Sequence, residues 1–289
     1  MTSRYIYIYV VFMASPTAKL GNRRVTGKEQ FYTPVPVAGW VIDRVLELVP
    51  QSLGQTWLEP SAGSGSFIEA LAQRGITDVI AMDIEPAHPL VLKQDFLSWK
   101  PMQSDMIAIG NPPFGRNNSL SIPFFNRCAE FCSTIAFIVP RSWRKWSVTN
   151  RLNLDFSCLA DFDLAVNYVD VQGADVYAKN NLRTCLQIWT KSESRRELVS
   201  IPDHGFVEKV APENADIALK VFGYGCGTVL TDFDRVPNTT LMFLKVNDRR
   251  AVSALREAPL SRYFNNVAYT EALAFTEVND ALNKLLVKS

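Results

Sequence analysis

Four short segments place polar or aromatic side chains directly after runs of apolar residues. In chain order they begin at Glu59, Asp83, Asp95 and Asn111. Apolar runs that alternate with helical patterns predict a parallel sheet covered on both faces. Ligands of such open α/β sheets bind at the carboxyl ends of the strands, so we expect the four segments to meet at one ligand site.

The first segment runs from Glu59 to Gly65 and joins an expected strand to an expected helix. Its two glycines, Gly63 and Gly65, let the backbone approach a ligand, and the start of the helix presents free N–H groups. Dinucleotide-binding folds and plain tight turns share this feature. Glu59, however, would repel a phosphate and attract a positive group. A sulfonium amino acid, S-adenosylmethionine, therefore fits the segment better than NAD or ATP does.

Acidic residues begin the second and third segments. Asp83 lies 24 residues after Glu59, at the end of the next strand, where an acid typically accepts hydrogen bonds from both ribose hydroxyls. The alternative role for Asp83 is a helix cap or a loop acid. The Asp95-Phe96 pair could bind an adenine amino group and cover its ring, although such a pair is also typical of a turn.

The fourth segment is Asn111-Pro112-Pro113-Phe114, which follows the apolar run 106–110. Consecutive prolines lack backbone donors and restrict the chain, so the carbonyls and the Asn111 side chain point in fixed directions. The segment therefore predicts a rigid set of hydrogen-bond acceptors beside an aromatic ring, rather than an ordinary proline-rich loop.

The apolar pattern also predicts the elements that position these segments. We expect helices at 35–49, 67–74 and 122–131, and strands at 56–58, 78–82, 106–110, 133–139, 164–171 and 182–190. The last two strands have no helix between them, which predicts an antiparallel end to the sheet. After residue 194 we expect short strands at 229–230 and 241–246 and helices near 249–258 and 276–287. The predicted fold class is α/β, a Rossmann-like, mostly parallel sheet with an antiparallel terminal strand, followed by a small C-terminal α+β module.

The composition argues against a disordered protein, a strongly basic nucleic-acid binder and a cysteine-ligated metal protein. The 289 residues are 47% hydrophobic and 20% charged, which is typical of a globular protein with a core. The net charge is +1, so any nucleic-acid contact must come from a local patch. The five cysteines form no CxxC pair and neither histidine lies near them in sequence, so we expect reduced thiols, a cytoplasmic protein and no metal.

The apolar stretch 5–14 is too short to span a bilayer, and we expect no membrane association. A secretion leader, or a biological start at Met13, are the alternative interpretations of this stretch.

In their order, the four segments resemble motifs I to IV of the amino-methylating, γ-type N6-adenine DNA methyltransferases. Phe31-Tyr32-Thr33-Pro34 resembles motif X of that family, which precedes motif I in the γ order. Residues 136–143 resemble motif VI, and residues 182–189, preceded by Tyr177, resemble the motif VIII region. The resemblance covers residues 27–193 and implies a Rossmann-like S-adenosylmethionine methyltransferase fold. It implies an N-terminal extension at 1–26, a catalytic domain at 27–194 and a small target-recognition module at 195–289.

The resemblance assigns roles to individual residues. The implied cofactor-binding residues are Tyr32, Thr33, Pro34, Glu59, Pro60, Ser61, Ala62, Gly63, Gly65, Asp83, Ile84, Asp95, Phe96 and Asn111. The implied catalytic residues are Asn111, Pro112, Pro113 and Phe114. Asn111 and the Pro112 carbonyl would accept hydrogen bonds from the target amino group, and Phe114 would stack on the target base. Tyr177 would be a second stacking partner.

Cationic residues flank the expected pocket and suit contacts with phosphates. They are Arg116, Arg141, Arg144, Lys145, Lys179 and Arg183. The stretch 141–146 (RSWRKW) interleaves cations with aromatic residues, which suits stacking as well, although a solvated helix face has a similar composition. The C-terminal module has 12 Lys and Arg against 12 Asp and Glu, so it shows no basic surplus.

These inferences predict an S-adenosylmethionine-dependent methyltransferase that modifies the exocyclic amino group of a flipped-out adenine in a nucleic acid, with DNA as the expected polymer. The alternatives are N6-adenosine methylation of RNA, glutamine methylation of a protein, and cofactor binding without catalysis. Glutamine methyltransferases usually have a tyrosine where Phe114 stands. No cysteine occurs in a motif that would supply the nucleophile of a cytosine-C5 methyltransferase.

Overall fold

The computed structural model describes residues 31–170, 173–174 and 182–287. The chain divides into two compact units. Unit 1 contains the described residues up to Pro140 together with Ser147–Glu197, and unit 2 contains Arg141–Trp146 and the described part of Leu198–Ser289. Tyr177, Lys179 and the expected N-terminal extension lie outside the described residues.

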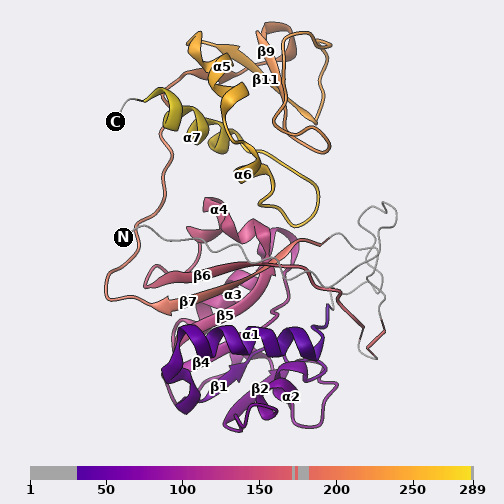
Figure 1. Ribbon diagram of the computed structural model, residues 1–289, viewed down its shortest axis with the longest axis vertical. Coiled ribbons are helices and arrows are strands. Elements are labelled where there is room, and N and C mark those ends of the chain that lie inside the picture. The colour runs from indigo at the N-terminus through magenta and orange to yellow at the C-terminus, as the bar shows by residue number, and fades with distance from the viewer. Residues whose placement is uncertain (1–30, 171–172, 175–181, 288–289) are drawn as a thin grey trace. The chain divides into compact units, whose positions relative to one another are not determined.

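Unit 1 is built on a seven-stranded sheet with the order β3-β2-β1-β4-β5-β7-β6. Its strands are β1 (Trp57–Glu59), β2 (Val79–Asp83), β3 (Leu92–Lys93), β4 (Met106–Gly110), β5 (Cys132–Pro140), β6 (Phe156–Leu164) and β7 (Thr184–Lys191). Strands β1 to β5 are mutually parallel, whereas β7 is antiparallel to both of its neighbours. Figure 1 shows these strands side by side with helices packed along them. The predicted mostly parallel sheet with an antiparallel end is therefore confirmed.

The helices of unit 1 follow the apolar spacing of the sequence. α1 (Val35–Leu48) buries residues at helical intervals, among them Val37, Val41 and Val45, and packs against α2 (Ser66–Ala72). α3 (Ser121–Cys128) precedes β5, and the four-residue helix α4 (Trp146–Thr149) follows it. β4 is buried along its whole length and β5 almost entirely, as expected of central parallel strands with both faces covered.

The strand predicted at 164–171 is wrong. The strand lies earlier, at β6, and the chain leaves the sheet after Leu164. A register irregularity between Cys158 and Ala160 breaks the alternation of buried and exposed side chains, and charged residues such as Asp161 lie within the strand. Because β6 is an edge strand with one interruption, its apolar pattern is too weak to predict it.

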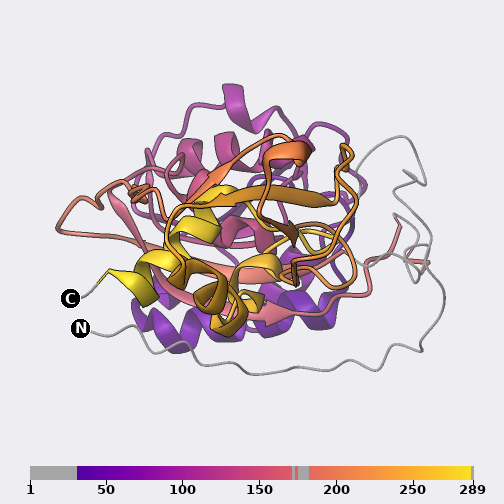
Figure 2. The same cartoon turned by 90° about the horizontal axis from the view of Figure 1, so that it is seen from above.

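Unit 2 contains a four-stranded antiparallel sheet with the order β10-β9-β11-β8. Its elements are β8 (Val207–Lys209), β9 (Ile217–Lys220), β10 (Val229–Leu230), β11 (Leu241–Val246), α5 (Arg250–Glu257), α6 (Ser261–Phe264) and α7 (Phe275–Leu286). α7, yellow in Figure 2, packs against α5, and both contribute to one apolar core with the sheet. The predicted elements β10, β11, α5 and α7 are confirmed, whereas β8 and β9 were not predicted.

A buried ion pair holds the stretch Arg141–Trp146 within unit 2. The Lys145 ammonium donates to both carboxylate oxygens of Glu277, at 3.0 and 3.1 Å, and the Glu277 side chain is only 6% exposed. The same carboxylate accepts the N–H of Ala274 at 2.7 Å, which satisfies a free donor at the start of α7. Trp146 packs beside them against Tyr263.

We expect Glu277→Gln to lower the free energy of unfolding by about 1.5–3 kcal/mol, because Lys145 would lose its counter-charge in a buried setting. Urea denaturation would measure the change. The exposed Glu257 of α5 provides the matched control, and its change to glutamine is expected to stay within about 0.5 kcal/mol of the native chain. Equal effects of the two variants would show that the pair does not stabilise unit 2.

Among the helices of the described ranges, none is long and apolar enough to cross a membrane.

Candidate cofactor and substrate site

The glycine-rich turn after β1 is closed by the neighbouring strand and by two side chains. Ala62 donates its N–H to the Met82 carbonyl of β2 at 2.9 Å. Gly63 and Gly65 have φ values of 47° and 83°, in the left-handed region that glycine tolerates. A Cβ on Gly63 would lie 2.5 Å from the Tyr32 ring, and one on Gly65 would lie 2.6 Å from the His88 ring. Both positions therefore require glycine for conformation and for space.

Glu59, the last residue of β1, is a buried carboxylate with an unsatisfied oxygen. The residue is 2% exposed, and its Oε2 atom has no hydrogen-bond partner among the residues that the structure describes. Burial raises the pKa of Glu59 well above its ordinary value, and the nearby negative charge of Asp83 raises it further. This carboxylate is therefore placed to bind a positively charged group and is costly to ionise without one.

Asp83 ties the end of β2 to the glycine-rich turn. Its two carboxylate oxygens accept the N–H groups of Gly63, at 2.9 Å, and Glu85, at 2.8 Å. Each oxygen keeps a second lone pair for a ligand hydroxyl. Ile84, the next residue, is 64% exposed and offers an apolar surface beside these oxygens.

Asn111 lies at the end of β4 with its amide in a defined orientation. Its Nδ2 donates to the Phe31 carbonyl at 2.7 Å, while its Oδ1 is buried without a partner in the described ranges. Ser61 of the glycine-rich turn donates its hydroxyl to the Asn111 carbonyl at 3.3 Å. The Phe114 ring, three residues on, is buried and stacks on the Phe31 ring. The structure thus brings the first and fourth predicted segments into contact.

The stretch from Phe31 to Pro34 covers this edge of the sheet. Tyr32 packs on Gly63, and Thr33 is buried with its Oγ1 unpaired in the described part of the chain. The Pro34 carbonyl accepts the N–H groups of Val37 and Ala38 and so begins α1. This arrangement joins the predicted motif X residues to the other segments through Gly63 and Asn111.

Three unpaired buried atoms belong to this one region: Thr33 Oγ1, Glu59 Oε2 and Asn111 Oδ1. Buried polar groups in proteins nearly always have a partner, and those that do not need a reason. The carboxylate and the hydroxyl suit a ligand that carries an ammonium group, and the amide oxygen of Asn111 is left to accept from a second N–H or O–H donor. The residues present therefore fit S-adenosylmethionine, whose amino-acid part has such an ammonium group.

The third predicted segment, Asp95-Phe96, is built into local structure. Asp95 accepts the N–H of Leu97 at 3.0 Å and caps a short 3-10 turn, Phe96–Ser98. The Phe96 ring is buried against Phe124 and Phe131. The capping contact matches the alternative of a turn, and the adenine-binding role of these two residues stays a prediction.

Two residues of the site were given no role in the predictions from the sequence. His88 covers Gly65 from the loop after β2, and Phe31 contacts both Asn111 and Phe114. Phe31 stands next to the predicted Tyr32 and could have been found from its place in that segment. His88 carries no comparable signal, because loop contacts of this kind depend on the path of the chain.

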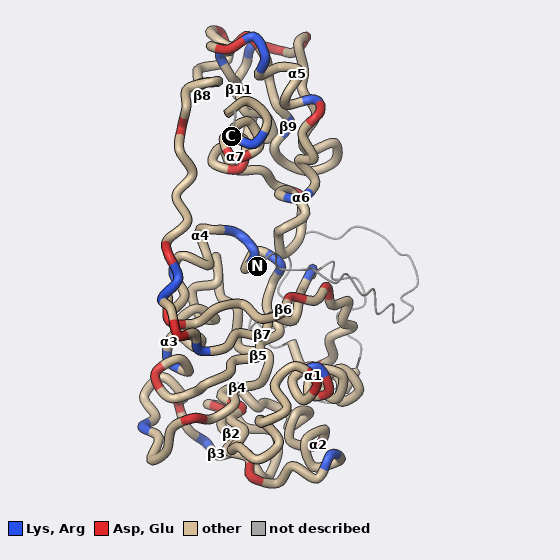
Figure 3. The backbone as a smooth tube through the Cα atoms, turned by 60° about the vertical axis from the view of Figure 1, so that its left-hand side comes forward, with Lys and Arg blue, Asp and Glu red and all other residues tan. Residues whose placement is uncertain are grey.

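The predicted nucleic-acid contacts are distributed over both units. Arg116 is exposed two residues after Phe114, in unit 1, whereas Arg141, Arg144 and Lys145 belong to unit 2. Figure 3 shows their blue stretch just before α4. The prediction that the aromatic residues of this stretch stack on bases is wrong for Trp143, which is fully buried. The Lys145 ammonium is paired with Glu277.

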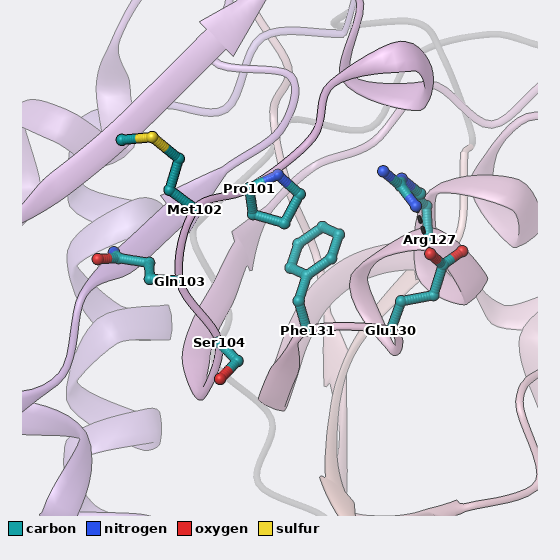
Figure 4. Close-up of a pocket in the computed structure, with 7 residues that line it drawn as sticks. All are labelled: Pro101, Met102, Gln103, Ser104, Arg127, Glu130 and Phe131. Atoms are coloured by element: carbon teal, nitrogen blue, oxygen red, sulfur yellow. Dashed lines mark hydrogen bonds and ion pairs between the residues drawn. The ribbon is translucent and has the colours of Figure 1, made fainter.

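A hollow of about 420 Å³ lies elsewhere in unit 1 (Figure 4). It is lined by the loop from Pro101 to Ser104 and by Phe131, with the Arg127–Glu130 ion pair at its rim. These residues precede β4 and β5, so the hollow is at the amino ends of the strands, opposite to Glu59 and Asn111. It is not part of the predicted site. In the described ranges, no group of His, Cys, Asp and Glu side chains is arranged to hold a metal ion.

Comparison with known proteins finds two curated relatives in Haemophilus influenzae. The Type II methyltransferases M.HincII and M.HindII are each 35% identical to this chain over 96 residues, which is 32% of this chain and 18% of theirs. The match therefore spans less than a fifth of the length of either relative. No protein-family model matches the chain.

Solved structures give more distant likenesses. The Pyrococcus horikoshii protein PH1948 has a TM-score of 0.47 and 17% identity, covering 60% of this chain and 91% of that one. The M protein of the Type I restriction enzyme EcoKI has a TM-score of 0.41 and 14% identity, covering 57% of this chain and 45% of that one. The 23S rRNA methyltransferase ErmE has a TM-score of 0.40 and 16% identity, covering 59% of this chain and 72% of that one.

The fold itself follows from the sheet. A glycine-rich turn follows β1, an acid ends β2, the strand order reverses between β1 and β4, and an antiparallel β7 is inserted between β5 and β6. Unit 1 has the Rossmann-like fold of the class I S-adenosylmethionine-dependent methyltransferases.

Proposed function

We propose that this protein is an S-adenosylmethionine-dependent methyltransferase that acts on the N6 amino group of adenine in a nucleic acid, with DNA as the polymer. The observation that carries the proposal is the pair of unsatisfied buried acceptors at adjacent strand ends, Glu59 Oε2 and Asn111 Oδ1. One suits the ammonium group of the cofactor and the other suits a target amino group. The names of the two curated relatives, both Type II methyltransferases, support the methyl-transfer part of the proposal.

Glu59, Thr33 and Asp83 would hold the cofactor. Glu59 would bind the ammonium group as a buried counter-charge, and Thr33 Oγ1 would offer a hydroxyl beside it. The Asp83 carboxylate, already fixed by two backbone N–H groups, would accept the ribose hydroxyls. When bound, S-adenosylmethionine supplies an electrophilic methyl group on a positively charged sulfur.

Asn111 and the Pro112 carbonyl would activate the target nitrogen. The lone pair of an adenine amino group is delocalised into the ring, which makes the nitrogen a poor nucleophile. Two acceptors that receive both of its N–H bonds draw it toward a tetrahedral shape and localise the lone pair. The Phe31 carbonyl holds Asn111 so that Oδ1 faces away from it, and preorganised acceptors of this kind need no rearrangement during the reaction.

The target base must leave the duplex to reach these acceptors. Flipping costs a few kcal/mol, and stacking on Phe114 would return part of that cost. Phosphate contacts by Arg116, Arg141 and Arg144 would return more. Unit 2 would then act as the target-recognition module. Residues of both charges are distributed along it (Figure 3), and a module of this size would read a short site.

Transfer of a labelled methyl group tests the proposal. The substrates are duplex DNA that contains adenine, structured RNA and a glutamine-containing peptide, each followed by digestion and identification of the methylated residue. Label on N6 of deoxyadenosine is the expected result. Label on adenosine in RNA would change the polymer, and label on glutamine, or none on any substrate, would contradict the proposal.

A further inference from the structure

Phe31 contacts both halves of the Asn111-Pro112-Pro113-Phe114 segment. Its backbone carbonyl accepts the Asn111 Nδ2–H at 2.7 Å. Its ring stacks on the Phe114 ring, with centroids 6.1 Å apart and an interplanar angle of 22°. One residue therefore orients the proposed acceptor for the target amino group and covers the proposed stacking platform for the target base.

Phe114 cannot receive a base while its surroundings stay as they are. The residue is only 6% exposed, so a base that stacks on the ring must displace a group that now packs there. Phe31 supplies a ring nearly parallel to that of Phe114, as a stacked base would. Phe31 itself is only partly buried, whereas Phe114 is buried.

Tyr168, a second ring beside Phe31, is anchored by a hydrogen bond. Tyr168 lies edge-on to Phe31, with ring centroids 5.5 Å apart, and is itself buried. Its hydroxyl is 3.2 Å from Thr184 Oγ1, and that hydroxyl donates to the Leu164 carbonyl at 3.1 Å. The Tyr168 ring is therefore anchored through its hydroxyl, a group that a phenylalanine ring lacks.

The backbone next to Phe31 is anchored independently of its ring. Tyr32 exchanges two hydrogen bonds with Val169, each of 3.1 Å, and Tyr32 packs on Gly63. α1 begins two residues later, after Pro34. Rotation of the Phe31 side chain would therefore leave its carbonyl in place on Asn111.

We propose that the Phe31 ring occupies the base-stacking face of Phe114 until the target base enters, and that the Phe31 carbonyl positions Asn111 throughout. This inference rests on the proposed function. Phe31 is then a gating residue through its ring and a positioning residue through its backbone. When the target base enters, its stack on Phe114 replaces the stack of Phe31 on Phe114. The Phe31 ring thus opposes the entry of other bases and keeps Phe114 covered in the meantime.

The test replaces Phe31 with alanine, which removes the ring and keeps the carbonyl. We expect the KM for a duplex oligonucleotide to fall about three- to tenfold, the range that an aromatic pair supports, with kcat within about twofold of the native value. An oligonucleotide with 2-aminopurine at the target position should show a larger fluorescence increase on binding the variant. Leu53→Ala, at an exposed leucine of unit 1 that precedes β1 and so lies toward the amino ends of the strands, is the matched control and should change neither value.

The alternative outcomes separate this inference from the proposed function. A rise in KM would mean that Phe31 forms one face of the base pocket, and an unchanged KM would mean that its ring is no obstacle; either result overturns the gate. A kcat that falls by the same factor as KM would also overturn the gate. Calorimetry with S-adenosylmethionine, expected to be unchanged, confirms that the variant is folded. Failure of the native protein to methylate adenine would instead remove the proposed function.

Discussion

Replacing Asn111 with alanine is expected to lower kcat for methyl transfer by about 10²–10³-fold, or roughly 2.7–4 kcal/mol, the loss seen when one preorganised hydrogen-bond group of an active site is removed. The variant lacks the buried Oδ1 acceptor. It also leaves the Phe31 carbonyl without its donor. Affinity for S-adenosylmethionine should change by no more than a few-fold, because Glu59, Thr33 and Asp83 remain. Single-turnover transfer of labelled methyl, with enzyme in excess over duplex DNA, measures the chemical step directly.

The matched control is Asn126→Ala, which removes another side-chain amide that donates to a backbone carbonyl, that of Arg151 at 3.0 Å. Asn126 lies in α3, which precedes β5, and the single-turnover rate of the variant should equal that of the native chain. If Asn111→Ala retained full activity, the activation of the amino nitrogen by this side chain would be wrong, whatever the substrate.

The central strands could be predicted from the sequence because burial on both faces produces continuous apolar runs. β4 and β5 were predicted to within one residue at each end. β6 was missed because it is an edge strand with an irregularity at Cys158 and charged residues along it. β8 and β9 were missed for a related reason. They are three and four residues long, and strands of that length hold too few residues to show a period.

The site could be predicted as a set of residues but not as a network. Parallel strands end at one edge, so the convergence of Glu59, Asp83 and Asn111 followed from the predicted topology. The contact between Phe31 and Asn111 joins residues 80 positions apart, and nothing local to either residue specifies it. For the stretch 141–146, in contrast, the structure differs from the prediction. Its composition suggested an exposed nucleic-acid surface, yet Trp143 is buried and Lys145 is paired, because long-range packing decided which side chains stayed exposed.

Glu59 links cofactor binding to pH. In the cofactor-free protein its pKa is raised, first by burial and then by Asp83. A group with a raised pKa in the folded state stabilises the fold fully below its unfolded pKa, about 4.3, and this contribution is lost as the pH rises through the folded pKa. Above that value, an ionised and unpaired Glu59 destabilises unit 1. A cationic ligand reverses the balance, because it binds the ionised form and releases the proton.

Glu59→Gln should therefore have opposite effects on stability and on binding. The variant is expected to be more stable than the native chain at pH values above the raised pKa, by about 1–3 kcal/mol, and to lose this advantage in acid. Its affinity for S-adenosylmethionine should fall about 10²-fold, or roughly 3 kcal/mol, because one partner of a buried charge pair is missing. Urea denaturation and calorimetry across the same pH range measure the two quantities.

The pH dependence distinguishes a buried counter-charge from a merely polar contact. For the native chain, S-adenosylmethionine affinity should rise as the pH increases through the raised pKa of Glu59, up to about pH 8, where an α-amino group begins to lose its proton. Calorimetry in buffers of different ionisation enthalpy should detect proton release in that range. Glu59→Gln should abolish both the slope and the released proton, whereas Glu69→Gln, at an exposed acid of α2, should keep them. A native affinity that is independent of pH, or one that falls as the pH rises below 8, would mean that Glu59 is not the group that binds the ammonium.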